Sequence, residues 1–211
     1  MFGRRSKQSG VVRSRSKTTT PDVLLKRATA MKRDGDLNGA IDTLQAAYVL
    51  MARESTIYRV DTYLRLPLYL QAAGRNDEAW SEFNRLISEG YPNQLSNFSI
   101  QTMEHSKIYN KMRLFLQREG KYDKAIVQGM LADLAWCRGL HMQGRAKEFA
   151  EHTSEAQFEK TLEPLVKKAG KSDCVTELVE IMRQAVSHPS RVDLAAAAKS
   201  AAAVINRSDS A

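Results

Sequence analysis

The stretch Gly74-Arg-Asn-Asp-Glu-Ala79 carries the pattern that decides the fold, since the chain contains three versions of it. Gly35-Asp-Leu-Asn-Gly-Ala40 and Gly120-Lys-Tyr-Asp-Lys-Ala125 also place an alanine five residues after a glycine. Glycine permits the tight turn that ends one helix. A small alanine in the first turn of the next helix lets the two helices approach closely. The pattern therefore predicts helical hairpins joined by short turns.

Apolar residues on both sides of these turns recur at spacings of three, four and seven, which is typical of amphipathic helices. No segment shows the alternation of a β-strand, and we expect an all-α fold. We expect Pro164 to bend or restart its helix, because its ring displaces an internal hydrogen bond. The expected helices cover approximately residues 21–34, 41–51, 57–73, 76–89, 101–118, 123–150, 153–169, 172–185 and 191–205.

Length and composition narrow the class of protein. The 211 residues suffice for one domain with tails. The chain has no run of roughly 18 apolar residues, so no membrane span is expected. The two cysteines, Cys137 and Cys174, cannot form a disulfide framework, which indicates a reducing compartment and a cytoplasmic protein.

The positive charge is concentrated in the N-terminal segment. The net charge of the chain is +8, and residues 1–20 have too few apolar side chains to order themselves, so we expect a disordered tail. A basic tail of this kind could bind phosphates without reading sequence, and an organellar transit peptide is a second interpretation. The tail contains no acid, and its six cations are Arg4, Arg5, Lys7, Arg13, Arg15 and Lys17.

At the three glycine-to-alanine stretches the chain resembles tetratricopeptide repeats, whose helical hairpins span about 34 residues each. Residues 21–54 and 60–93 match over both helices, although Pro67 stands where the family has a small residue. Residues 106–139 match less well, because Gly129 replaces a bulky residue. The anchoring alanines lie 39 and 46 residues apart, so loops between the pairs must absorb the extra residues.

The resemblance implies stacked antiparallel helical hairpins, a tetratricopeptide-like α-solenoid with extra C-terminal helices. The predicted organisation is a disordered basic tail over residues 1–20, helical repeats over 21–150 and a C-terminal helical extension over 151–207. The alternative is an irregular α-bundle in which the glycines and alanines coincide by chance.

The search for a catalytic or metal site gives no candidate. Ala169-Gly-Lys-Ser172 resembles the end of a phosphate-binding loop, but it lacks the first glycine and a preceding strand, so we interpret it as a helix stop. Cys137 and His141 share a helix face with only His152 nearby, which falls short of a tetrahedral metal site. The pair Lys167-Lys168 is interpreted as solvated surface. We predict no catalytic residue, metal or cofactor, and an enzyme of unknown class stays as a minor alternative.

The resemblance further implies that the first helices of the pairs line a concave groove. The family's carboxylate clamp is not intact here, because Leu25 and Thr29 occupy its first-pair positions. A groove that mixes leucine with amides suits an amphipathic helix or an extended peptide. The residues predicted to face the groove are Leu25, Thr29, Asp61, Leu64, Leu68, Gln71, Asn110 and Leu114.

The resulting functional prediction is a non-catalytic protein–protein interaction module, such as an adaptor, scaffold or chaperone-like protein. Its expected partner is another protein or peptide. The alternative is a nucleic-acid-associated protein that uses the basic tail. The oligomeric state stays open.

Overall fold

The computed structural model describes residues 19–207, and every regular element in this range is a helix. The sequence prediction of an all-α fold is confirmed for this part of the chain. The α-helices are α1 (Pro21–Arg33), α2 (Leu37–Met51), α3 (Val60–Tyr63), α4 (Arg65–Ala72), α5 (Asn76–Ser88), α6 (Phe98–Arg118), α7 (Tyr122–Met142), α8 (Ala146–His152), α9 (Glu155–Ala169), α10 (Val175–Ser187) and α11 (Leu194–Arg207). Two 3-10 turns, Ser172–Cys174 and Pro189–Arg191, flank α10.

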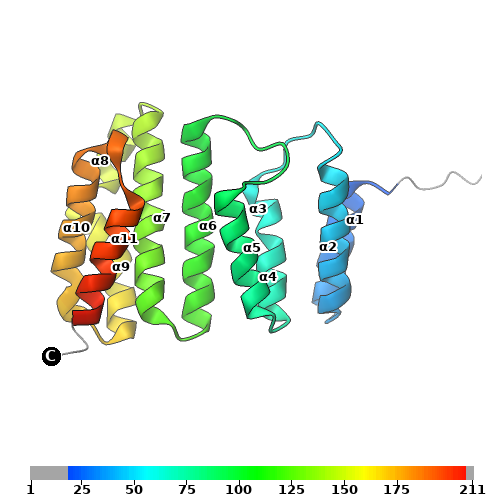
Figure 1. The fold of residues 1–211 in the computed structure, drawn as a ribbon, viewed down its shortest axis with the longest axis horizontal. Coiled ribbons are helices and arrows are strands. Elements are labelled where there is room, and N and C mark those ends of the chain that lie inside the picture. Colours follow the sequence, from blue (N-terminus) through cyan, green and yellow to red (C-terminus); the bar gives the residue numbers. More distant parts are fainter. Residues whose placement is uncertain (1–18, 208–211) are drawn as a thin grey trace, which may run out of the picture.

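Helices that are neighbours in sequence pack against each other in pairs. Helix α1 packs on α2, α4 on α5 and α6 on α7, while α2 contacts α4 and α5 contacts α6. Figure 1 shows the pairs side by side in chain order along the long axis, with α8 to α11 gathered beyond α7. Helix α11 contacts both α7 and α10, so the C-terminal helices cover one side of α7.

The glycines of the sequence pattern close their helices in the same way. Gly74 has a φ of 74°, its N–H donates to the Gln71 carbonyl at 3.0 Å, and the Arg75 N–H donates to the Leu70 carbonyl at 2.9 Å. These two bonds define a Schellman motif, which satisfies carbonyls that the helix end leaves free. The same pair of bonds closes helices at Gly35, Gly120, Gly144 and Gly170.

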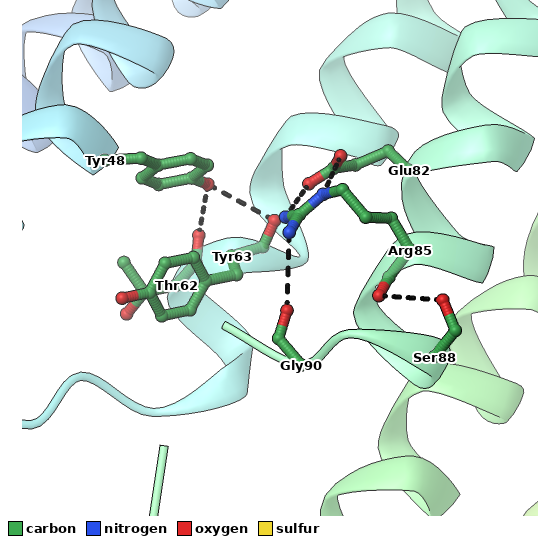
Figure 2. Close-up of polar contacts among 7 residues, drawn as sticks. All are labelled: Tyr48, Thr62, Tyr63, Glu82, Arg85, Ser88 and Gly90. Carbon is green, nitrogen blue, oxygen red and sulfur yellow. Dashed lines mark hydrogen bonds and ion pairs between the residues drawn. The ribbon is translucent and has the colours of Figure 1, made fainter. Parts of the chain in front are cut away.

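The expected helix over residues 57–73 is wrong as a single element, because the helical segment is interrupted at Leu64 between α3 and α4. Pro67 lies in the first turn of α4 and has no N–H to donate to the Tyr63 carbonyl. The Tyr48 hydroxyl donates instead to the carbonyls of Thr62, at 2.7 Å, and Tyr63, at 3.2 Å (Figure 2). A side chain from α2 therefore supplies hydrogen bonds where the proline interrupts the helix.

Three tyrosines form a cluster beside this break, in which Tyr63 and Tyr91 are buried and Tyr48 is partly buried. The Tyr63 ring stacks on Tyr91 with centroids 4.5 Å apart and lies 5.0 Å from Tyr48. Burial raises the pKa of Tyr63 to about 12, and it also raises the pKa values of Tyr48 and Tyr91. Nearby, Arg85 donates to Glu82 on its own helix and to the Gly90 carbonyl, as Figure 2 shows. The cluster fixes how α2, α3 and the loop after α5 meet.

Two further expectations change in the second half of the chain. The helix expected from residue 123 to 150 is two helices, because Gly144 takes a φ of 69° and ends α7 before α8 begins. Helix α9 runs without a restart through Pro164. The interpretation of Gly170 as a helix stop is confirmed, since it takes the left-handed conformation after α9.

The buried apolar residues form two cores that meet within α7. The N-terminal core includes buried residues from Leu25 to Ala125, and the C-terminal core includes those from Ile126 to Ile205. The boundary predicted at residue 150 falls inside α8, which has no buried residue. Helix α7 thus belongs to both cores and joins them.

One buried cation ties the last helix to the start of α7. Lys171 is 5% exposed; its ammonium donates to the Ile205 carbonyl at 2.8 Å and lies 3.4 Å from the Asp123 carboxylate. A buried ammonium needs such partners because it has lost its hydration. Lys171 therefore links the end of α9, the N-terminus of α7 and α11.

Candidate binding groove

A groove of about 560 Å³ lies between α6, α7 and α9. Helix α7 provides its floor, α6 one wall, and α9 with the end of α8 the other. A volume of this size suits a small ligand or a few residues of a peptide. The lining residues are Ser106, Lys107, Asn110, Arg113, Gln117, Gly129, Ala132, Asp133, Trp136, His152, Gln157, Thr161, Pro164, Leu165 and Lys168.

Small residues on α7 keep the floor of the groove low. A Cβ atom on Gly129 would come within 2.9 Å of a Leu165 methyl and 3.2 Å of the Arg113 Cδ. The first of these distances is too short for a real contact and the second is tight, so a larger side chain would displace the Leu165 methyl and shift the Arg113 stem. Glycine at this position departs from the repeat pattern, and the structure explains it by the close approach of α6 and α9 side chains.

Arg113 projects from α6 into the groove with only neutral partners. Its Nε and Nη2 donate to the Asn110 amide oxygen at 3.0 and 2.7 Å, and its Nη1 donates to the Gln117 amide oxygen at 3.2 Å. Burial lowers the pKa of Arg113, although the charge of Asp133 opposes the shift. In the described part of the chain, Arg113 forms no ion pair with a carboxylate.

Two lysines also line the groove, and they differ in how they are neutralised. The Lys107 ammonium lies 2.8 Å from the Asp61 carboxylate of α3, so its charge is already paired. Lys168 projects from α9 on the opposite wall and has no ion-pair partner within residues 19–207. The unneutralised positive charge of the groove therefore comes from Arg113 and Lys168.

Asp133 places a carboxylate among these cations at the floor. One of its oxygens, Oδ2, is buried and accepts no hydrogen bond from residues 19–207. Burial raises the pKa of Asp133, while the nearby Thr161 hydroxyl, which donates to the Gln157 carbonyl at 3.2 Å, and the charges of His152 and Arg113 act in the opposite direction. A buried acceptor without a donor is costly, and it marks a point where a ligand N–H would be stabilised.

Trp136 and His152 close the end of the groove near α8. Their rings lie 6.2 Å apart between centroids, and the His152 Nδ1 lies 3.0 Å from the Glu148 carbonyl. The Trp136 side chain is only partly buried and lines the groove. The arrangement offers an aromatic surface, two cations and a buried acceptor in one cavity.

The predicted groove residues divide into two sets. Leu25 and Leu64 are only 9% and 1% exposed and belong to the N-terminal core, so their placement on a binding surface is wrong. The prediction assumed one continuous helix here, whereas the structure interrupts it at Leu64 between α3 and α4. Thr29 and Asp61 are exposed but engaged, Thr29 with Arg65 and Asp61 with Lys107.

The other predicted residues lie closer to open surface. Asn110 lines the groove and orients Arg113. Leu68 and Gln71 line a second cavity of about 440 Å³ between α4 and α6, whereas Leu114 is half-buried and lines neither cavity. The structure thus brings Asn110 to the groove and separates it from the residues of the first pair. The six tail cations lie outside the described residues.

Several groove residues were not identified from the sequence. Lys168 was interpreted as solvated surface, and Arg113, Asp133, Gln157 and Thr161 were not singled out. The one available signal was Gly129, whose lack of a side chain indicated a close approach without naming the partner. Cys137 and His141 do not converge on an ion site: within residues 19–207 no three metal-ligating side chains cluster, and Cys137 contacts the His152 carbonyl.

Comparison with known proteins identifies no relative, so the function is inferred from the geometry of the groove. No family model, curated protein or solved structure matches the chain. Among residues 19–207, no helix combines the length and the apolar character needed to cross a bilayer. Both cysteines are buried and free.

Proposed function

We propose that this chain is a non-catalytic protein-interaction module whose groove between α6, α7 and α9 receives a peptide segment. The observation that carries the proposal is the groove itself, an open cavity of about 560 Å³ walled by helices from two hairpin layers. Peptide recognition between helices commonly uses such surfaces. The groove mixes aromatic, amide and charged side chains, which suits a peptide better than a purely apolar ligand.

The tetratricopeptide-like arrangement of stacked hairpins is part of this proposal. Its support is that the first helices of successive pairs are bridged directly. Arg65 of α4 donates to the Leu25 carbonyl of α1 at 2.7 Å, and Gln71 of α4 donates to the Phe115 carbonyl of α6 at 3.2 Å. In a stack of hairpins the equivalent helices of neighbouring repeats lie side by side, and these bonds have that pattern.

Selection from a displayed library of random short peptides tests the proposal. The wild-type chain is expected to enrich a family of related peptides, and Gln157→Trp is expected to abolish the enrichment because an indole at this wall position fills the groove. Glu159→Trp is the matched control, since Glu159 is exposed on α9 and lines no cavity described here. Enrichment by both variants, or by neither the wild type nor the control, would contradict a peptide-binding groove.

A second function is favoured by the charge of residues 1–20, which hold six cations and no acid. In this alternative the tail attaches the helical array to a nucleic acid through phosphate contacts. Binding of the full chain to double-stranded DNA or RNA should then weaken steeply with added salt, and deletion of residues 1–20 should abolish it. Salt-independent binding, or binding that survives the deletion, argues against this function.

A further inference from the structure

We infer that the groove recognises an acidic residue of its peptide, with the ligand carboxylate held between Arg113 and Lys168 and a ligand N–H donated to Asp133. The inference rests on the proposed function and specifies the chemistry of the bound segment. It assigns a role to three groove residues from three helices, α6, α7 and α9.

Arg113 is prepared for a carboxylate by the residues around it. Asn110 and Gln117 accept three of its N–H bonds and fix the plane of the guanidinium without neutralising it. A guanidinium has five N–H donors, so about two are left for a ligand. Charged hydrogen bonds of guanidinium to carboxylate are stronger than those between neutral groups, and a fixed side chain loses less freedom on binding.

Lys168 supplies the second positive charge from across the groove. It lies on the α9 wall, has no ion-pair partner within the described residues, and also borders a small cavity beside Lys121 and Lys124. Lys107 cannot serve in the same way, because Asp61 already neutralises it at 2.8 Å. An anionic group that enters between the walls therefore meets Arg113 on one side and Lys168 on the other.

Asp133 selects among anions. A phosphate group would be repelled by the carboxylate at the floor and has no N–H to offer to the buried Oδ2. An aspartate or glutamate within a peptide presents a carboxylate and main-chain N–H groups within a few atoms of each other. A phosphate ester carries nearly twice the negative charge of a carboxylate near neutral pH, so the carboxylate of Asp133 repels it more strongly. The mixed charge of the groove thus favours an acidic peptide over a phosphorylated one, and a nucleic acid lacks main-chain N–H groups.

Gly129 makes this arrangement geometrically accessible. The Arg113 stem and Leu165 both pass over Gly129, so a Cβ atom there would displace the Leu165 methyl and press on the Arg113 Cδ. Gly129 is a positioning residue, because its backbone sets how low Arg113 lies above α7. Gly129→Ala should therefore weaken acidic peptides more than matched amide peptides, which a general loss of packing would not do.

The test begins with the peptides that the full chain selects from the random displayed library. We expect one position of the selected family to be enriched in aspartate or glutamate. Fluorescence anisotropy then compares the best peptide with the same peptide carrying asparagine or glutamine at that position. Loss of a charged hydrogen-bond pair of this kind should weaken binding about tenfold or more.

Variants of the chain locate the effect. Arg113→Gln should remove the preference for the acidic peptide over its amide version, Lys168→Gln should reduce it, and Arg113→Lys should retain part of it. Lys160→Gln is the matched control, because Lys160 is an exposed cation of α9 that does not line the groove. Circular dichroism melts confirm that each variant is folded before its affinity is compared.

The outcomes separate this inference from the function on which it rests. Selected peptides that bind equally well in acidic and amide forms would overturn the acidic anchor and leave peptide binding intact. A preference that persists in Arg113→Gln would also overturn it. Selection of no peptide at all would overturn the proposed function, and an oligonucleotide that competes for the groove in an Arg113-dependent manner would replace the peptide with a nucleic acid.

Discussion

The two cores of the molecule are built from different side chains. The N-terminal core buries the aromatic residues Tyr63, Tyr69, Phe83, Tyr91 and Phe115. The hydroxyls of Tyr48 and Tyr63 donate to backbone carbonyls of other elements, and the Tyr91 hydroxyl donates to the Glu104 carboxylate. Within residues 19–207, the C-terminal core buries Phe158 as its one aromatic ring and otherwise packs aliphatic side chains and thiols. Aromatic edges and hydroxyls fix directions that aliphatic packing leaves freer.

This difference reflects what each half has to hold together. The N-terminal half contains a helix break at Leu64 and long loops before α3 and α6, which need specific hydrogen bonds. The C-terminal half has short turns, and up to residue 207 its helices are positioned by apolar contact plus one buried cation, Lys171. The half that contains the helix break and the long loops thus uses directional hydrogen bonds and aromatic contacts. The half with short turns relies mainly on aliphatic packing.

The largest expected effects come from removing one ring from each core. Phe83→Ala and Phe158→Ala should each lower the free energy of unfolding by about 3–5 kcal/mol, because both side chains are fully buried and a cavity would remain. Urea denaturation followed by circular dichroism measures the loss. Phe98→Ala is the control, since Phe98 is half exposed and should cost far less.

Hydrogen exchange of the same variants tests whether the two cores unfold separately. If the cores are distinct, Phe83→Ala should reduce protection in α4 and α5 more than in α10, and Phe158→Ala should do the reverse. An equal loss of protection over the whole chain in both variants would show that α7 joins the two cores into one cooperative unit.

The next effect concerns the buried cation of the C-terminal half. Lys171→Ala should lower the free energy of unfolding by about 2–3 kcal/mol, since the Ile205 carbonyl and Asp123 each lose a charged partner. Exchange protection should fall first in α11. Lys160→Ala, an exposed lysine on α9, should stay within about 0.5 kcal/mol of the wild type. Unchanged protection of α11 in Lys171→Ala would mean that apolar contact alone holds this helix.

Alkaline pH should weaken the two cores through different groups. Burial raises the pKa of Cys137 to about 12 from a usual value near 9, and that of Tyr63 to about 12 from a usual value near 10. The folded state then binds more protons than the unfolded state between these values, so stability falls as pH rises from about 9 to about 12. A pKa difference of one corresponds to about 1.4 kcal/mol, so we expect a loss of at most about 4 kcal/mol from Cys137 and about 3 kcal/mol from Tyr63 over their windows.

Two variants assign the alkaline loss. Cys137→Ala should delay the onset of the fall from about pH 9 to about pH 10. Tyr63→Phe should keep the early onset and make the fall above about pH 10 less steep without removing it, because Tyr48 and Tyr91 also have raised pKa values. Urea midpoints measured at intervals of pH give both slopes. A fall of unchanged slope in both variants would place the titrating groups elsewhere.

The smallest effect on stability is expected from exposed ion pairs, which both halves contain. Asp61→Asn removes the exposed pair with Lys107 in the first half, and Glu177→Gln removes the exposed pair with Arg207 in the second. Each should change the free energy of unfolding by about 0.5 kcal/mol or less, because water and salt screen such pairs. A loss above about 1 kcal/mol for Asp61→Asn would show that the bridge between α3 and α6 is more than a surface contact.

Much of the fold could be predicted from the sequence, because helix ends are local events. The positive φ at Gly35, Gly74 and Gly120 follows from the residue type, and the apolar series between them give the helices. The break at Leu64 was missed since it depends on Pro67 and on the Tyr48 hydroxyl of another helix. Gly144 was passed over because apolar residues continue on both sides of it.

The groove could be predicted only in part, because it depends on how α9 packs beside α6. The repeat register predicted Asn110 correctly as a groove residue, because helical periodicity determines which face a residue occupies within a single helix. Arg113 and Lys168 are 55 positions apart in the sequence, and no periodicity relates them. Gly129 signalled a close approach, but which side chains pass over it is a property of tertiary packing.

The shared helix α7 gives an occupied groove a mechanical role. A ligand held by Arg113 and Lys168 would touch α6, which packs in the N-terminal half, and α9, which packs in the C-terminal half, across a floor that belongs to both. Binding would then act as a removable cross-link at the seam. By mass action, a ligand at 100 times its Kd adds about 2.7 kcal/mol to the free energy of unfolding. Both halves would then unfold together, at a higher temperature than in the free protein.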